Sequence, residues 1–187
     1  MRKAVFLDRD GTINIDHGYT YRLEDLELFP GSSQAIRLLN DAGYLVIVVT
    51  NQAGIARGYF TRADAEAFNN ELQRELLAQG SRIDAFYYCP HHPEGLPPYN
   101  IICNCRKPAP GMLLKAQEDW KIDFRSSWVI GDKWSDLQAG ITVGCKPLLV
   151  LTGNGKDEAE YVPKVIPRCI DLLAAARIIL EVSCVIK

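Results

Sequence analysis

The sequence is poor in the features that mark membrane proteins and nucleic-acid-binding proteins. No apolar run in its 187 residues approaches the roughly 20 that a membrane-spanning helix needs. Acidic residues slightly outnumber basic ones, for a formal net charge of −2, and the chain has no basic tract. A phosphate backbone or an anionic lipid surface attracts concentrated positive charge. We therefore expect neither nucleic acid nor a membrane as a partner.

The chain also lacks a recognisable secretory signal. Its start, MRKAVFLDRDG, has only four consecutive apolar residues before the acids begin, so it predicts a strand and not a signal peptide. We expect a cytoplasmic location, where the six cysteines stay reduced. A chain with 48% hydrophobic residues can bury an ordinary core without disulfides. Repeats and clear linkers are absent, which favours a single domain over residues 1–187.

Short apolar segments alternate with segments of helical periodicity. The expected strands are 4–7, 44–51, 84–89, 126–132 and 146–153. The expected helices are 32–42, 61–79, 111–120, 135–141 and 170–180. This alternation predicts an α/β fold with a Rossmann-like, mostly parallel sheet and helices on both faces. In such sheets ligands bind beyond the carboxyl ends of the strands.

Polar side chains that suit a metal and a phosphate stand at those strand ends. Asp8 closes the first strand and Asp10 follows two positions later, so an extended backbone would point both carboxylates to one side. Carboxylates so close repel each other unless a cation lies between them. Asp132 closes the fourth strand, and three carboxylates suit a hard cation such as Mg²⁺. The groups that suit phosphoryl oxygens are Thr50, Asn51 and Lys107.

The loop CPHHPEGLPPYNIICNC, residues 89–105, indicates a second metal site. It offers Cys-x-His at one end and Cys-x-Cys at the other, a ligand set typical of structural zinc. The ligands are Cys89, His91, Cys103 and Cys105, with His92 as an alternative to His91. A proline-rich loop this long needs an anchor, which zinc would supply; buried free cysteines are the other interpretation. Cys145, Cys169 and Cys184 lack partners at ligand spacing and are expected in the core or tail.

Four short motifs resemble the signatures of the haloacid dehalogenase (HAD) superfamily of phosphohydrolases. They are D-R-D-G-T at 8–12, V-T-N at 49–51, R-K-P at 106–108 and I-G-D-K-x-x-D at 130–136. The resemblance covers roughly residues 3–153 and implies an HAD-type phosphatase. Members often carry a separate cap domain after the first or third strand, but both intervals are too short for one here. Substrate recognition would then come from loops.

The resemblance also implies a role for each matching residue. Asp8 would be the nucleophile that forms an aspartyl phosphate, and Asp10 the general acid and base. Thr50 and Lys107 would stabilise the transferred group. The implied Mg²⁺ ligands are the Asp8 and Asp132 carboxylates and the Asp10 backbone carbonyl. Asp136 would orient Lys133 or the waters of the metal, with a plain helix-surface acid as an equal alternative.

The zinc loop joined to R-K-P is similar to two branches of the superfamily, the histidinol-phosphate phosphatases and the heptose 1,7-bisphosphate 7-phosphatases. N-x-D-H-G-Y at 14–19 and T-N-Q-A-G-I-A-R-G at 50–58 resemble the heptose branch more closely. That branch removes the 7-phosphate of D-glycero-D-manno-heptose 1,7-bisphosphate, in nucleotide-activated heptose and lipopolysaccharide biosynthesis. The substrate-contacting positions it implies are Asp16, His17, Gly18, Tyr19, Asn51, Gln52, Ala53, Arg106 and Lys133.

Some alternatives stay open. Ala53 departs from the family pattern, which often has Ser, although its backbone amide could still contact phosphate. For His17 and Tyr19, packing within the loop is as good an interpretation as contact with sugar. A nucleic-acid 3′-phosphatase shares the D-x-D-G-T chemistry, but the acidic balance disfavours it. A zinc-organised interaction module would not need an intact D-x-D pair. We expect a monomeric, Mg²⁺- and Zn²⁺-containing enzyme for a small sugar bisphosphate.

Overall fold

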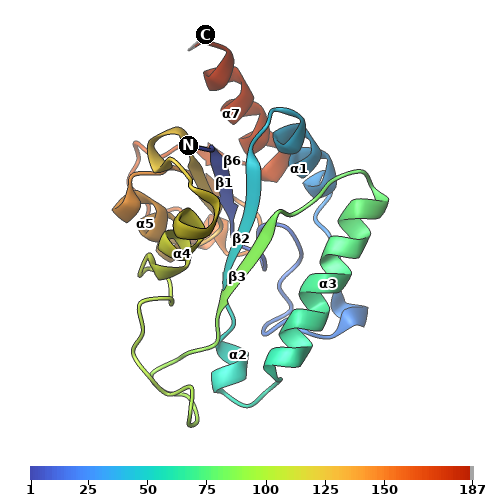
Figure 1. The fold of residues 1–187 in the computed structure, drawn as a ribbon, viewed down its shortest axis with the longest axis vertical. Helices are drawn as coiled ribbons and strands as arrows, with labels where there is room; N and C mark the ends of the chain where they lie inside the picture. Colours follow the sequence, from blue (N-terminus) through green and yellow to red (C-terminus); the bar gives the residue numbers. More distant parts are fainter. Residues whose placement is uncertain (186–187) are drawn as a thin grey trace.

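The computed structural model describes residues 1–185, with side chains through Val182, so the Cys184 side chain lies outside the described part. Within it, six strands form one sheet in the order β3-β2-β1-β4-β5-β6 (Figure 1). The strands are β1 (Ala4–Leu7), β2 (Leu45–Asn51), β3 (Ala85–Cys89), β4 (Trp128–Gly131), β5 (Lys146–Val150) and β6 (Arg168–Cys169). Every pairing between neighbouring strands is parallel, which confirms the predicted fold class.

Helices cover both faces of this sheet. The main ones are α1 (Ser32–Asp41), α3 (Arg62–Ala78), α4 (Gly111–Trp120), α5 (Trp134–Val143) and α7 (Leu172–Val185). α1, α3 and α7 contribute to one apolar cluster, and α4 and α5 to the other. Successive strand residues point to opposite faces, so Val5 and Leu7 belong to the first cluster and Ala4 and Phe6 to the second. Because both faces are buried, the strands are continuous apolar runs.

Several short elements lie where the sequence predicts loop. They are η1 (Leu23–Asp25), α2 (Ala53–Ala56), η2 (Phe124–Ser126), α6 (Gly155–Glu158) and the edge strand β6. Elements of two to four residues are too short to show a periodicity. Four strands are also shorter than predicted: β2 and β3 each begin one residue later, β4 begins at Trp128 and ends at Gly131, and β5 ends at Val150. The last helix begins later, at Leu172, and runs further, to Val185.

The centre of the sheet positions the carboxyl-end residues. β1 lies between β2 and β4, with Leu7 paired to Val48 on one side and to Ile130 on the other. The residues that follow these strands are therefore neighbours at one edge of the sheet. Within the described residues, no helix combines the length and apolar character needed to cross a membrane.

Candidate active site

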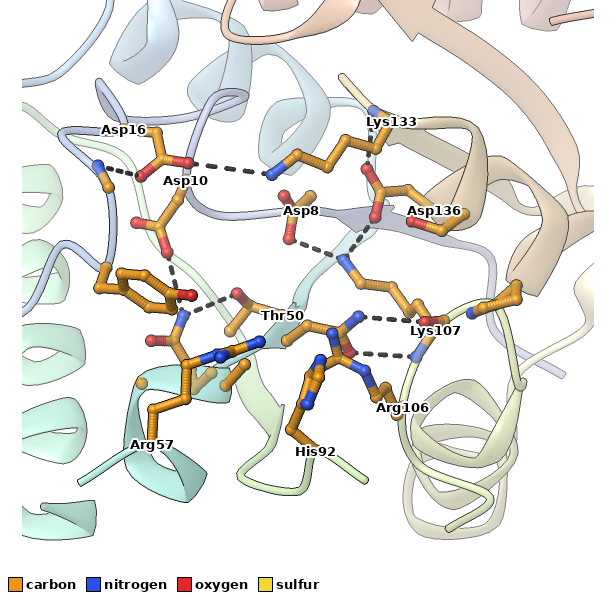
Figure 2. Close-up of a pocket in the computed structure, with 18 residues that line it drawn as sticks. Asp8, Asp10, Asp16, Thr50, Arg57, His92, Arg106, Lys107, Lys133 and Asp136 are labelled. Carbon is orange, nitrogen blue, oxygen red and sulfur yellow. Dashed lines mark hydrogen bonds and ion pairs between the residues drawn. The ribbon is translucent and has the colours of Figure 1, made fainter. Parts of the chain in front are cut away.

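The carboxyl ends of β1 and β2 and the loop after β4 border a cavity of about 700 Å³ (Figure 2). The predicted residues that line it are Asp8, Asp10, Asp16, Gly18, Tyr19, Thr50, Asn51, Gln52, Ala53, Arg106, Lys107 and Lys133. Asp132 lies buried beside this cavity, within reach of Asp8. His17 is exposed and is not part of the lining. The fold thus brings the predicted set together, with His17 outside it.

Lys107 lies between two carboxylates in the cavity. Its Nζ is 2.7 Å from Asp8 Oδ1 and 2.8 Å from Asp136 Oδ1, and it donates to the Val49 carbonyl at 2.7 Å. Burial by itself would lower the pKa of Lys107, but Asp136 and Asp8 raise it above its ordinary value, so the ammonium stays charged. Asp136 is buried and also accepts a hydrogen bond from the Lys133 amide at 3.0 Å. The alternative of a helix-surface acid at this position is therefore wrong.

The carboxylates of Asp8, Asp132 and Asp136 form a buried cluster whose chemistry fits a divalent cation. One oxygen of each lies within 4.8 Å of the others. Asp132 Oδ2 accepts hydrogen bonds from the amide and side chain of Asn154, whereas its buried Oδ1 has no hydrogen-bond partner among the described residues. Burial and the charge of Asp8 raise the pKa of Asp132 to about 7, and burial raises the pKa of Asp8. A bound Mg²⁺ would reverse both shifts, since it binds ionised carboxylate oxygens.

Two glycines leave room for Asp132. A Cβ atom at Gly11 would lie 2.3 Å from Asp132 Oδ2, and one at Gly153 would lie 2.5 Å from it. Both glycines also have positive φ angles, +91° and +53° respectively, a conformation that other residues adopt with strain. The backbone of two loops therefore approaches the Asp132 carboxylate closely and helps to fix the orientation of this carboxylate.

The Asp10 carboxylate does not belong to this cluster and instead faces Arg9. Arg9 donates from Nε to Asp10 Oδ1 at 3.0 Å and from Nη2 to Oδ2 at 2.7 Å. Asn14 donates to Oδ1 at 2.9 Å and Gln52 to Oδ2 at 3.0 Å. Burial would raise the pKa of Asp10, but Arg9 and these hydrogen bonds hold it below its ordinary value. Gln52 also donates to Thr50 Oγ1 at 2.9 Å, which joins Asp10 to the phosphate-binding candidates.

Side-chain contacts hold the loops around the cavity in place. Asn51 binds the backbone of Lys107 twice, accepting from its amide at 3.0 Å and donating to its carbonyl at 3.1 Å. Lys133 Nζ lies 3.8 Å from Asp16 Oδ2, which ties the loop after β1 to the end of β4. Asn51 thus has a structural role beside any contact with substrate.

Two basic side chains of the cavity escape prediction from the sequence as substrate-binding groups. Arg57 and His92 line it together with Arg106, and Figure 2 shows these three side chains on one side of the pocket. Within the part of the chain that the structure describes, the buried Nε of Arg57 has no hydrogen-bond partner. Arg106 Nη1 donates to the His91 carbonyl at 3.3 Å. Arg57 follows α2 in a segment that the sequence predicts as a loop, and the sequence offers His92 only as an alternative zinc ligand.

The cysteines of the loop after β3 meet as the zinc pattern predicts. The Sγ atom of Cys89 lies 3.5 Å from that of Cys103 and 3.0 Å from that of Cys105. His91 Nδ1 lies 3.3 Å from Cys105 Sγ. Zinc–sulfur bonds of about 2.3 Å place tetrahedral ligands roughly 3.7 Å apart, so these ligands need only move apart slightly to form a closed zinc site. His92 lies outside the cluster, on the catalytic cavity.

Comparison with known proteins gives consistent matches. Residues 104–175 match a family described as HAD-hydrolase-like. D-glycero-beta-D-manno-heptose-1,7-bisphosphate 7-phosphatase of Pasteurella multocida is 45% identical over 168 residues, which cover 87% of this chain and 91% of that protein. The protein of the same name from Escherichia coli K12 is 46% identical over 81% of this chain and 80% of its own length.

Solved structures agree with the sequence matches. The crystal structure of D,D-heptose 1,7-bisphosphate phosphatase from B. bronchiseptica, complexed with magnesium and phosphate, is similar with a TM-score of 0.87. It is 37% identical, and the match covers 96% of this chain and 98% of that one. The corresponding phosphatase from Burkholderia thailandensis matches with a TM-score of 0.72 and 36% identity, over 96% of this chain and 99% of its own.

Proposed function

This chain belongs to the D-glycero-beta-D-manno-heptose-1,7-bisphosphate 7-phosphatase family of HAD hydrolases, and we propose that Asp8 and Asp10 carry its chemistry. The enzyme hydrolyses the 7-phosphate of the heptose bisphosphate in a Mg²⁺-dependent reaction. The observation that best supports this assignment is the buried Asp8–Lys107 pair beside a carboxylate cluster that fits a divalent cation. A buried nucleophile with a lysine at 2.7 Å is arranged to receive an anionic phosphate.

The reaction has two displacement steps at phosphorus. In the first, an Asp8 carboxylate oxygen forms a bond to phosphorus while the bond to the C7 oxygen breaks. Asp10 gives a proton to that oxygen, a proton that it must first take up against the lowering of its pKa by Arg9. In the second, Asp10 takes a proton from water as the water oxygen attacks the aspartyl phosphate. Inorganic phosphate leaves and the Asp8 carboxylate is restored. Thr50 and Lys107 donate to the phosphoryl oxygens in both steps.

The two metals have separate roles. The residues that would hold Mg²⁺ are Asp8, Asp132 and the Asp10 backbone carbonyl. When bound, this ion neutralises the charge of the phosphoryl group and of the nearby carboxylates. We propose structural Zn²⁺ at Cys89, His91, Cys103 and Cys105. Because Arg106 follows the last of these cysteines directly, the zinc loop would also set the position of that cation.

A second phosphate distinguishes the heptose substrate from histidinol phosphate. The distal group of the bisphosphate is an anion, whereas histidinol phosphate presents a cationic amine. Arg57, His92 and Arg106 lie on one side of the cavity. This surface attracts a phosphate and repels an amine. The contacts that we propose for the sugar itself come from Asp16, Gly18, Tyr19, Gln52, Ala53 and Lys133.

A substrate comparison tests the proposed function. Mg²⁺-dependent phosphate release should be fast with the heptose 1,7-bisphosphate and slow with histidinol phosphate or a DNA 3′-phosphate. Asp8→Asn should abolish release from the bisphosphate while leaving the fold intact, because an amide cannot form the acyl phosphate. Near-normal turnover by folded Asp8→Asn protein, or a preference for histidinol phosphate, would contradict the assignment.

The Arg106→Ala variant tests the source of selectivity. It should lower kcat/KM for the bisphosphate by about 2–4 kcal/mol, the order expected when one partner of a charged hydrogen-bonded pair is lost. A sugar monophosphate without the distal group should hardly be affected. Arg74, exposed on α3 and paired with Glu71, provides a matched control. If both substrates lose activity equally, Arg106 serves the reacting phosphate and not the distal one.

We further propose that residues 1–187 act as one domain and as a monomer in the cytoplasm, without nucleic acid or membrane as partner. The two apolar clusters lie on the two faces of the same sheet, which supports a single folding unit. Size-exclusion chromatography with light scattering tests the oligomeric state. A stable dimer at low protein concentration would refute the monomer.

A further inference from the structure

Arg9 is a fully buried cation whose contacts the reaction described above does not use. Its guanidinium lies over the ring of Phe68, with 4.3 Å between Cζ and the ring centroid. Its Nη1 donates to Asn69 Oδ1 at 3.0 Å. Both partners belong to α3, some sixty positions along the chain. Stacking on the ring and a hydrogen bond in the guanidinium plane together fix the orientation of that plane.

The opposite edge of the same guanidinium binds the Asp10 carboxylate. Nε and Nη2 bind the two carboxylate oxygens at 3.0 and 2.7 Å, a bidentate contact that makes the carboxylate coplanar with the guanidinium. Asn14 and Gln52 add one hydrogen bond to each oxygen. α3 therefore sets the direction of the Asp10 carboxylate through Arg9, although Asp10 itself stands on a loop.

Arg9 also reaches the loop over the cavity. Its Nη2 donates to the Thr20 carbonyl at 2.8 Å. Thr20 Oγ1 accepts from the His17 amide at 2.9 Å and lies 3.3 Å from Asp16 Oδ1. Asp16 and Tyr19 of this loop line the cavity. One buried side chain thus contacts the acid–base candidate, a helix of the core and the loop that would face the sugar.

We propose that Arg9 is a positioning residue that aligns Asp10 with the leaving group by anchoring it to α3. The proposal rests on the assigned role of Asp10 as general acid and base. A lysine would keep the buried positive charge but lose the fork, since one ammonium cannot bind both carboxylate oxygens, Asn69 and Thr20 in one plane. The Asp10 carboxylate would then keep a positively charged partner but lose its fixed orientation.

A double-mutant cycle tests this role with the heptose bisphosphate as substrate. Arg9→Lys should lower kcat by about 10- to 100-fold, the loss expected from misplacing a catalytic group by around 1 Å, with a smaller change in KM. In an Asp10→Asn background the same substitution should change kcat by less than about twofold, because a group already removed cannot be misaligned. Equal losses of kcat in both backgrounds would overturn the proposal.

Two further variants keep the test decisive. Asn69→Ala removes the hydrogen bond to Arg9 Nη1 without changing any contact of Asp10. It should therefore give a smaller loss of kcat, which should also vanish in the Asp10→Asn background. If Arg9→Lys protein does not fold, Asn69→Ala takes its place in the cycle. Leu39→Ala, in the same apolar cluster but on α1, is the control for general destabilisation and should leave kcat unchanged below its melting temperature. A background-dependent kcat loss in Leu39→Ala would overturn the proposal. Full activity of Asp10→Asn alone would refute the assigned acid–base role, a separate result.

Discussion

Replacing Lys107 by methionine removes the cation at the centre of the site while keeping a side chain of similar length. The substitution would leave Asp8 and Asp136 without their shared counter-ion at 2.7 and 2.8 Å, and the Val49 carbonyl without its donor. The carboxylate side chains are only 7% and 3% exposed, so water solvates their charge poorly once the ammonium is gone.

The structure sets the size of this effect. Removing one partner of a buried ion pair costs about 3–5 kcal/mol, because an uncompensated charge stays in the interior. Protonation of Asp8 or Asp136 limits this cost. Protonating a carboxylate costs about 1.4 kcal/mol for each unit by which the pH exceeds its pKa. We expect the free energy of unfolding to fall by about 3–5 kcal/mol without added Mg²⁺, which lowers the melting temperature by about 6–20 °C. Mg²⁺ should restore part of this loss, since it supplies positive charge to the same cluster.

Urea and thermal unfolding, with and without Mg²⁺, measure the effect. Lys115 provides a matched control, because its Nζ also binds two carboxylates, at 3.2 Å (Glu118) and 2.8 Å (Asp119), but on the surface. Lys115→Met should change stability too little to measure. Phosphate release by Lys107→Met should fall by about 10²–10³-fold, as when one donor to a developing charge is lost. Equal and small stability changes in the two variants would refute the reasoning.

Three other predictions concern the acid, the zinc loop and the close approach at Asp132. Asp10→Asn should lower kcat for the bisphosphate by about 10²–10⁴-fold in phosphate-release assays, and near-normal turnover would contradict its role. Protein purified without chelators should contain about one zinc per chain by metal analysis, and a zinc-free native protein would exclude the zinc site. Cys103→Ser should make the loop after β3 sensitive to proteolysis. Gly153→Ala should raise the Mg²⁺ concentration for half-maximal activity by about 10- to 100-fold, because the new Cβ displaces Asp132. Gly43→Ala is its control, since Gly43 also has a positive φ but open space around it, and an equal effect would implicate backbone strain instead.

The sequence by itself determined the sheet, the meeting of Cys89, His91, Cys103 and Cys105, and most of the residues that we propose for catalysis. Asp8, Asp132 and Thr50 each stand at the end of an apolar strand. Because neighbouring parallel strands run in the same direction, their carboxyl ends lie at the same edge of the sheet, even when the strands are far apart in the sequence. Local spacing was also enough for the cysteine cluster, whose ligands lie at the two ends of one loop. For these residues, the place in the strand or loop is enough to predict which other residues lie nearby.

Only the tertiary structure decided which side chains meet across elements. Asp136 pairs with Lys107, Asp10 with Arg9, and Arg9 with Asn69 of α3. The sequence left Asp136 between alternatives, and left His17 between contact with the sugar and packing within the loop; in the structure the His17 side chain is exposed and outside the cavity lining. Such contacts depend on how far each helix lies from the sheet and how each loop crosses its edge. Those distances come from the packing of the two apolar clusters, which the spacing of residues along one segment does not encode.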